Sequence, residues 1–214
     1  MKKEAEATRK LAEALHSDDP GYKSAGNIDF IIFLVGLVAA MLIVRAFVFE
    51  PVRVDGPSMM NTLQDSERCI VEKISYLFSS PKQGDIVIIH YPGRGNEAFV
   101  KRVIATAGQT VELGSETNNG ETKYFILIDG VRLDESAYED TLLFDAGRSN
   151  IPLRSPGSVN GVFTVPEGCI FVMGDHRTNS KDSRDPDVGA IELSQVVGRV
   201  RGVMFPLSGI RWVG

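Results

Sequence analysis

The chain has few cysteines and no excess of basic residues, and it therefore lacks the marks of disulfide-rich and nucleic-acid-binding proteins. Its two cysteines are too few for a disulfide framework. We expect Cys69 and Cys169 to be unpaired structural residues, although a pairing in an oxidising compartment stays open. The 23 Lys and Arg residues are outnumbered by 28 Asp and Glu, so the basic excess typical of nucleic-acid binding is missing. A content of 43% hydrophobic and 24% charged residues excludes a disordered chain.

Charge is absent from one long stretch near the N-terminus, Phe30 to Val44. A membrane span needs roughly 20 apolar residues, and extension to Phe49 supplies them at the cost of including Arg45, which can snorkel to the headgroups. A buried core helix is one alternative, but the run is apolar on every face. A cleavable signal peptide is another, but its apolar part would begin nearer the N-terminus. We predict one transmembrane signal anchor over residues 28–49.

The residues before this anchor predict its orientation. Residues 2–16 are rich in helix formers and predict a short solvated helix, and residues 17–27 predict a loop. More Lys and Arg precede the span than closely follow it, which favours a cytoplasmic tail, residues 1–27, at the plasma membrane. The residues counted are Lys2, Lys3, Arg9, Lys10 and Lys23 before the uncharged run Phe30 to Val44, and Arg45 and Arg53 after that run.

From residue 50 to 214 the pattern changes to short runs of β-branched and aromatic residues separated by Gly, Pro, Asn and Asp. This predicts a mostly β domain outside the membrane. We expect a hairpin loop at 112–123 and a long exposed loop at 146–161. The apolar C-terminal run 202–214, with Phe205 and Trp212, is either a final core strand or a surface that lies against lipid.

A first chemical candidate is Ser58, in the segment VDGPSMMNTL. Alone it could be a turn residue, since a reactive serine needs a base. The usual base is histidine, and the chain has only three histidines. His16 falls on the cytoplasmic side of the predicted span. Neither His90 nor His176 stands in a recognisable motif.

Lysine is the alternative base, provided that burial lowers its pKa from about 10.4. The apolar strand EAFVKRVIATAG supplies Lys101, which shares one strand face with Phe99 and Val103. Arg102 lies on the other face, which is equally apolar, but arginine is not deprotonated in proteins. A solvated Lys–Arg pair at a strand edge is the competing interpretation.

The third candidate is the polar loop VMGDHRTNSKDSRDPD, residues 172–187. It could be merely solvated. Its Asp182, Asp185 and Asp187 could bind a metal, but their spacing does not match a calcium loop. We expect no metal and no cofactor.

Together with a fourth segment, these stretches resemble the motifs of bacterial type I signal peptidases, and the match is to the shorter Gram-positive-like form. The resemblance covers residues 28–214 and keeps the order of the family's motifs behind one membrane anchor. In chain order the matching segments are PSMMNTL, GDIVIIHYP, FVKRVIATAGQTVEL and MGDHRTNSKDSR.

The resemblance implies a signal-peptidase-type β fold preceded by one transmembrane helix, and a Ser–Lys endopeptidase. Ser58 matches the family nucleophile and Lys101 its general base. Ser180 matches a serine that orients the lysine, and Asp182 and Arg184 match a supporting pair. The implied substrates are secreted preproteins cut after small residues at −1 and −3. Five positions match the substrate pocket of the family: Val54, Met59, Leu63, Phe99 and Val100.

The sequence departs from the family pattern at several positions. Gly56 stands where some members have a serine whose hydroxyl joins the oxyanion hole, so the oxyanion would rest on backbone N–H groups, that of Ser58 first. Asn61 replaces a usual Pro, His176 a usual Asn, and Thr178 a common acidic or Asn residue. None of these is a matched catalytic group.

Two other functions compete with this interpretation. A self-cleaving repressor-type Ser–Lys protease would carry a DNA-binding domain where this chain has the apolar run. A catalytically silent β-domain, tethered to the membrane and binding exported proteins, would not need Ser58, Lys101 and Ser180 together.

Overall fold

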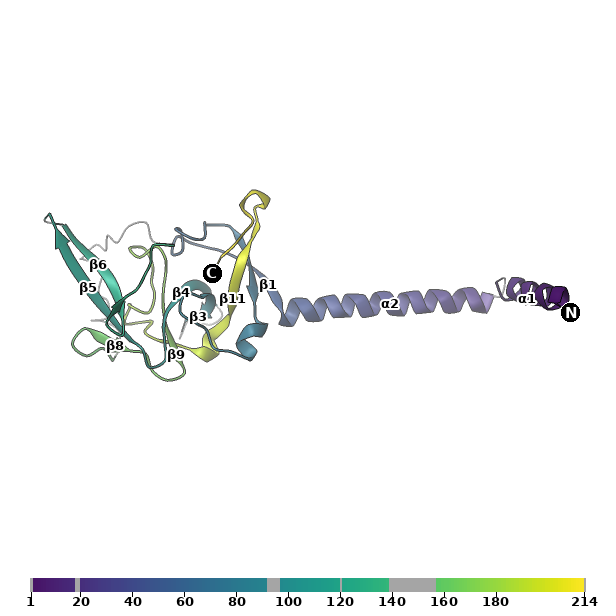
Figure 1. Cartoon of the computed structure of the whole chain (residues 1–214), viewed down its shortest axis with the longest axis horizontal. Helices are drawn as coiled ribbons and strands as arrows, with labels where there is room; N and C mark the ends of the chain where they lie inside the picture. The colour runs from purple at the N-terminus through teal and green to yellow at the C-terminus, as the bar shows by residue number, and fades with distance from the viewer. Residues whose placement is uncertain (1, 18–19, 92–96, 120, 139–156, 214) are drawn as a thin grey trace. The chain divides into compact units, whose positions relative to one another are not determined.

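The structure is a computed structural model that describes residues 2–17, 20–91, 97–119, 121–138 and 157–213. The chain divides into two compact units, Met1–Phe47 and Val48–Gly214 (Figure 1). The first unit is helical and the second is mostly β, as the sequence predicts.

Two helices form the first unit, α1 (Lys2–Ser17) and α2 (Pro20–Phe47). The short charged helix is confirmed, and its exposed face carries the i,i+4 ion pairs Arg9–Glu13 and Lys10–Glu6. The predicted loop at 17–27 is wrong, because α2 already begins at Pro20. Proline is favoured in the first helical turn, where its missing N–H has no helical partner. Once the long apolar run forms helix, each residue added at its N-terminal end costs little.

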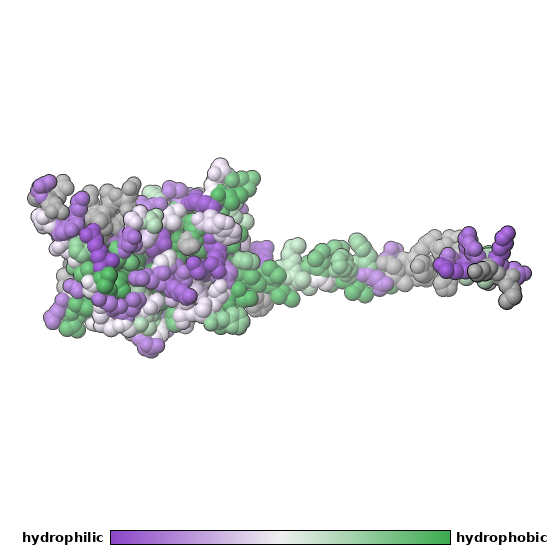
Figure 2. All heavy atoms as spheres, in the orientation of Figure 1, coloured by the Kyte–Doolittle hydropathy of each residue, from purple (hydrophilic) through white to green (hydrophobic). Residues whose placement is uncertain are grey.

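The apolar part of α2 has the length and composition of a membrane span. Asn27–Arg45 is 19 residues long with a mean hydropathy of 2.5. Its large apolar side chains are exposed all round, including Phe30 at 64% and Phe33 at 67%, and they form the continuous green stretch of α2 in Figure 2. An all-round apolar exposed surface does not suit a core helix. This helix is therefore consistent with a single-pass membrane anchor.

The second unit contains two antiparallel sheets. The larger sheet has the strand order β1-β2-β11-β3-β4-β9-β10, with β12 paired to β11. Its strands are β1 (Phe49–Arg53), β2 (Arg68–Glu72), β3 (Ile86–His90), β4 (Ala98–Thr106), β9 (Cys169–Met173), β10 (Ile191–Glu192), β11 (Val196–Phe205) and β12 (Arg211–Trp212).

The smaller sheet has the order β7-β6-β5-β8. Its long hairpin corrects the prediction of a loop at 112–123, since pairing continues from Val111↔Ile128 out to Asn118↔Glu121. The turn itself is short, with Asn119 at φ +54°, a conformation that Asn tolerates better than most residues. The strands are β5 (Thr110–Asn118), β6 (Glu121–Ile128), β7 (Val131–Arg132) and β8 (Val162–Thr164).

Three short 3₁₀ helices complete the described elements: η1 (Ile74–Leu77), η2 (Leu193–Gln195) and η3 (Leu207–Gly209). The predicted loop at 146–161 lies outside the described residues up to residue 156. The cysteines are unpaired, as expected: Cys69 is buried, and Cys169 is partly exposed. Burial raises the pKa of the Cys69 thiol to about 11, which makes it an unreactive core residue.

Apolar side chains cover both faces of the central strands. In β3, Ile86 and Ile88 belong to one core cluster, while Val87 and Ile89 belong to another on the opposite face. This follows from the alternation of side chains along a strand. A strand buried on both faces reads as an unbroken apolar run, so periodicity alone gave no choice of face for the neighbouring strand β4.

The C-terminal run 202–214 is split between the two predicted roles. Val203 and Val213 are buried in the first core cluster, so the run does contribute a core strand. Leu207, Ile210 and Trp212 are exposed by 76%, 62% and 84%. These three side chains form an apolar surface next to η3 that the fold itself does not cover.

Candidate active site

Ser58 and Lys101 meet in the structure although 43 residues separate them. The Lys101 Nζ atom lies 2.8 Å from Ser58 Oγ and is hydrogen-bonded to it. Ser58 lies between β1 and β2, and Lys101 lies in the middle of β4. The pair therefore depends on the sheet, which brings a loop and a distant strand together.

Lys101 is buried because β4 is an inner strand, paired with β3 on one side and β9 on the other. Lys101 is only 2% exposed to solvent. Its partner in the pairing of β3 with β4 is Val87. Burial lowers the pKa of Lys101 from 10.5 to about 8, against an opposing pull from the Asp182 carboxylate. This is the direction that the sequence predicts, and it makes a neutral amine available near neutral pH.

The end of β9 holds the Ser58 segment from the other side. The His176 N–H donates to Ser58 O at 3.0 Å. A Cβ atom on Gly174 would stand 2.4 Å from Ser58 O and 2.3 Å from Ser180 Oγ. Only glycine at this position lets the two segments approach so closely.

Asp175 connects the Ser58 segment to the strand that carries Lys101. It is fully buried and accepts two hydrogen bonds from Arg102, at 2.8 and 2.7 Å. The Thr62 hydroxyl also donates to Asp175 Oδ2, and the Asn61 amide donates to its backbone carbonyl at 3.3 Å. The carboxylate thus ties β4 to the loop after the serine.

Arg102 is therefore not one half of a solvated pair at a strand edge. It is 6% exposed, donates to Gly84 O at 2.9 Å and lies over the Tyr138 ring, 3.9 Å from its centroid. The sheet buries both Lys101 and Arg102 on opposite faces. Arg102 is ion-paired with Asp175, while Lys101 has no carboxylate within ion-pair distance in the described part of the chain.

Asp182 and Arg184 form a second buried pair, with Arg184 Nε and Nη2 donating to the carboxylate at 2.7 and 2.8 Å. Burial by itself would raise the pKa of Asp182, but the Arg184 charge and the Gly174 N–H hold it below its ordinary value. Because that charge persists, Asp182 acts on Lys101 as a nearby anion that favours the ammonium form. The burial of Lys101 outweighs this effect.

Ser180 lies beside the pair but is not joined to Lys101 by a hydrogen bond in the described residues. Its hydroxyl oxygen is buried and has no hydrogen-bond partner of ordinary geometry there. It is still near enough to Asp182 to contribute to the low pKa of that carboxyl. Its predicted orienting role stays a prediction.

Comparisons with known proteins identify the family of this chain. Residues 27–205 match the family model described as "Signal peptidase, peptidase S26". The chain belongs to this signal peptidase family.

Curated relatives support the same membership over most of the chain. A probable signal peptidase I-1 from Synechocystis sp. is 37% identical over 188 residues, covering 85% of this chain and 82% of the relative. Signal peptidase I from Bacillus licheniformis is 36% identical over 178 residues, covering 83% and 88%. A crystal structure of a signal peptidase I from Enterococcus faecalis is 29% identical, with a TM-score of 0.40 over 56% of this chain and 97% of that one.

Membership makes the chain a peptidase, a hydrolase, with the mostly β fold of signal peptidases behind one N-terminal apolar helix. Within it, four of the five pocket positions predicted from the family pattern share one core cluster: Val54, Met59, Leu63 and Val100. Phe99 lies apart from them, against another cluster, with its ring stacked on Tyr91 at a centroid distance of 4.2 Å. The assignment of these residues to a substrate pocket stays a prediction.

A third buried ion pair could not be anticipated from the sequence. Arg177 Nη1 lies 2.6 Å from Glu135 Oε1, with side-chain exposures of 2% and 3%. Glu135 lies in a short polar segment with no motif around it. Only the tertiary fold brings it into contact with Arg177 of the 172–187 loop. Asp175 and Arg102 carried a weak signal, since each lies inside a recognised motif segment without matching one of the family's site residues.

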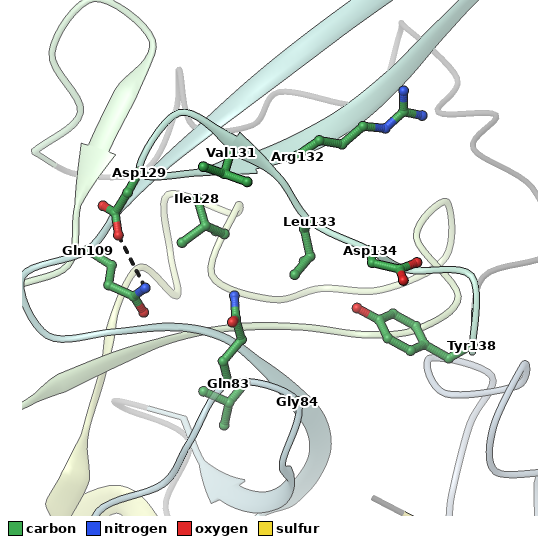
Figure 3. A pocket seen from close by; sticks show the side chains of 11 residues that line it. Gln83, Gly84, Gln109, Ile128, Asp129, Val131, Arg132, Leu133, Asp134 and Tyr138 are labelled. Carbon is green, nitrogen blue, oxygen red and sulfur yellow. Dashed lines mark hydrogen bonds between the residues drawn. The ribbon is translucent and has the colours of Figure 1, made fainter.

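The structure also has a cavity of about 580 Å³, whose lining side chains are drawn in Figure 3. It contains neither Ser58 nor Lys101. Tyr138 and Gly84 line it and also contact Arg102. Its polar groups already have partners: the Gln109 amide donates to Asp129 at 3.3 Å. Among the described residues no group of three or more His, Cys, Asp or Glu side chains is arranged to hold a metal.

Proposed function

We propose that this protein is a type I signal peptidase that cuts N-terminal signal peptides from exported preproteins, with Ser58 as nucleophile and Lys101 as general base. One observation carries the proposal: the buried Lys101 amine is 2.8 Å from the Ser58 hydroxyl oxygen. A serine hydroxyl becomes nucleophilic when a neighbouring base takes its proton. The Lys101 amine can accept that proton because burial lowers its pKa to about 8.

In the acylation half-reaction, neutral Lys101 takes the Ser58 proton while Oγ attacks the carbonyl carbon of the −1 residue. The carbonyl oxygen becomes an oxyanion. The Lys101 ammonium then gives its proton to the nitrogen of the +1 residue, and the C–N bond breaks. The mature protein leaves with a free amino terminus, and the signal peptide stays as an ester on Ser58.

In the deacylation half-reaction, a water molecule attacks the ester carbonyl carbon and Lys101 takes a proton from that water. The bond to Ser58 Oγ breaks, and Lys101 returns the proton to the serine. The signal peptide leaves with a carboxylate. No histidine enters this scheme: the His90 ring nitrogen contacts Glu97 O at 3.1 Å, and that of His176 contacts Pro57 O at 3.1 Å.

Arg184 and Asp182 support the dyad in this proposal. They hold the 174–184 loop against the base, and the Asp182 carboxylate limits how far burial lowers the pKa of Lys101. Ser180, buried beside them, is proposed to orient the amine once a substrate orders the site.

The proposed substrates carry small residues at −1 and −3. Val54, Met59, Leu63 and Val100 stand at 0–9% exposure. A close-packed apolar wall of this kind would admit Ala and exclude larger side chains, because overpacking costs typically about 1–3 kcal/mol. Phe99, stacked on Tyr91 and half-buried, packs against a different core cluster and is proposed to contact the substrate separately from this wall.

We propose that the span lies in the plasma membrane with the N-terminus in the cytoplasm and the peptidase unit on the outer face. The cleavage site of a preprotein is tethered at that face by its own apolar segment. An enzyme anchored there meets it at a high effective concentration. The exposed Leu207, Ile210 and Trp212 would add contact with lipid, and Trp is favoured at such interfaces.

The deciding experiment is cleavage of a preprotein by the detergent-solubilised full chain, followed by N-terminal sequencing of the product. Cleavage after a small residue, lost in Ser58→Ala, is expected. A folded protein that binds the preprotein without cutting it would support the silent β-domain. Cleavage of its own chain but of no preprotein would support the repressor-type alternative.

A further inference from the structure

His176 donates two hydrogen bonds to consecutive carbonyl groups at the nucleophile. Its ring Nδ1 lies 3.1 Å from Pro57 O. Its backbone N–H lies 3.0 Å from Ser58 O. The ring is half-buried. These two contacts hold the peptide units on either side of the Ser58 Cα atom.

The chemistry of the Pro57 contact determines which nitrogen of the ring carries hydrogen. A carbonyl oxygen can only accept a hydrogen bond, so Nδ1 must be the donor. Neutral His176 is therefore the Nδ1–H tautomer. The same oxygen also accepts from the Met60 N–H at 3.1 Å, so two donors determine the direction of the Pro57 carbonyl.

The direction of the Pro57 carbonyl also determines the direction of the Ser58 N–H. The Pro57 C=O and the Ser58 N–H belong to one planar peptide group and point in opposite directions when the peptide is trans. The cis bond in the described chain lies elsewhere, at Phe205–Pro206. The Ser58 N–H donates no backbone hydrogen bond among the described residues. It is a donor held in place with its hydrogen still available.

The residue two positions before the serine offers no side-chain donor to an oxyanion, which leaves more of this task to the Ser58 N–H. Gly56, at φ +91°, has no side chain to donate a hydrogen bond. A developing oxyanion on the substrate carbonyl would depend on backbone N–H groups, and a donor aimed in advance stabilises it without reorganisation.

We infer that His176 is a positioning residue for the oxyanion hole: its Nδ1–H holds the Pro57–Ser58 peptide so that the Ser58 N–H faces the developing oxyanion. This inference rests on the proposed function. His176 takes no proton from the serine in this role, since Ser58 Oγ is already hydrogen-bonded to the Lys101 amine. Its effect falls on the transition state and therefore on kcat.

The chain offers a matched control and a conservative replacement. His90 makes the same kind of contact elsewhere, Nδ1 to Glu97 O at 3.1 Å, so His90→Ala removes an equivalent bond outside the site. In His176→Asn the side-chain amide nitrogen stands one bond beyond Cγ, as Nδ1 does in histidine, and it can donate to the same carbonyl.

The experiment measures kcat and KM of the full chain in detergent with a signal-peptide substrate, for His176→Ala, His176→Asn and His90→Ala. Loss of a whole oxyanion donor costs about 10²–10³-fold in kcat. Met60 still holds Pro57 O in His176→Ala, so we expect a loss of roughly 10-fold in kcat with KM nearly unchanged. His176→Asn should recover most of the loss, and His90→Ala should behave as wild type.

Inhibition by a peptide aldehyde separates positioning from general loosening. The aldehyde forms a hemiacetal on Ser58 whose oxygen occupies the oxyanion position, so His176→Ala should weaken inhibition by the same factor as kcat/KM. An unchanged kcat, a change confined to KM, or unaltered aldehyde inhibition in a folded His176→Ala protein would each overturn the inference.

A spectroscopic measurement tests the inference independently of the proposed function. Nitrogen NMR of ¹⁵N-histidine-labelled protein should show neutral His176 with hydrogen on Nδ1. Hydrogen on Nε2 would overturn the inference even in an active enzyme. If the wild-type protein cleaves no signal peptide while His176 shows the Nδ1–H form, the proposed function fails and the hydrogen bond stands.

Discussion

The amine of Lys101 lies 2.8 Å from the hydroxyl oxygen of Ser58, in a position only 2% exposed to solvent. The two residues come from different parts of the chain, a loop after β1 and the inner strand β4. The β sheet therefore supplies both the proximity of the pair and the burial that lowers the pKa of the amine.

Replacing Lys101 by arginine is expected to abolish preprotein cleavage. Arg keeps the positive charge but cannot take a proton from Ser58, because its pKa stays above about 12 in proteins. The measurement is the rate of preprotein cleavage, with thermal unfolding to establish that the variant is folded. Near-normal activity of Lys101→Arg would mean that the lysine is a structural cation.

A second substitution, Lys101→Met, should separate the effect on activity from the effect on stability. The net lowering of the pKa from 10.5 to about 8, in which burial outweighs the pull of Asp182, corresponds to a net penalty on the ammonium of roughly 3 kcal/mol. Met has a similar length and no charge, so the variant should be inactive but at least as stable as wild type at neutral pH. A large loss of stability in Lys101→Met would show that the amine contributes to holding the fold.

The pH profile of kcat/KM follows from the lowered pKa of Lys101. The active form is the neutral amine, which is populated above the pKa, so activity should rise through a pH of about 8 to an alkaline plateau. At pH 7 about a tenth of the amine would be neutral, compared with well under 0.1% for an unshifted lysine. A rate that stays flat from pH 6 to 9 would contradict this assignment.

The matched control removes both histidines of the peptidase unit. His90→Ala combined with His176→Ala should keep the rising limb at the same pH, even though the His176 change lowers kcat. Disappearance of the limb in a folded double variant would identify a histidine as the base.

Gly174→Ala is expected to damage both stability and activity. The new Cβ would stand 2.4 Å from the backbone oxygen of Ser58 and 2.3 Å from Ser180 Oγ, so the nucleophile segment must move. Overpacking of this kind costs about 1–3 kcal/mol, and we expect at least a 10-fold loss of kcat. Chemical denaturation and cleavage assays measure the two effects.

Gly209→Ala is the control for that substitution, since its nearest contact to a new Cβ is 3.6 Å away. Gly209→Ala should change neither the stability nor kcat by much. Equal behaviour of the two alanine variants would show that the close approach of Gly174 to Ser58 has no functional weight.

The orientation of the span predicts a pattern of protease protection. A protease added outside intact cells or spheroplasts should digest the unit Val48–Gly214, whereas a tag at the N-terminus should stay protected. More Lys and Arg precede the span than closely follow it, and such residues near a span are retained on the cytoplasmic side. Digestion of the N-terminal tag from outside would reverse the assignment, and permeabilised cells serve as the control.

Local physical chemistry was enough to predict much of the architecture. The apolar run Asn27–Arg45 could be recognised as a span because hydrophobicity all round a helix has few other uses. The β runs after residue 50 followed from β-branched residues between turn formers. The start of α2 was missed because turn-forming residues at 17–27 outweighed the tendency of the following helix to extend to Pro20.

The sequence by itself determined the candidate chemistry: a serine without a nearby histidine motif, and a lysine within an apolar strand where Arg102 could not serve as base. Only the tertiary structure decided how these groups meet. Periodicity could not choose between the two faces of β4, because both faces are buried. The partners of Arg102, Arg177 and the Pro57 carbonyl are Asp175, Glu135 and His176. Each lies far along the chain, and such contacts form only when antiparallel pairing and core burial bring distant segments together.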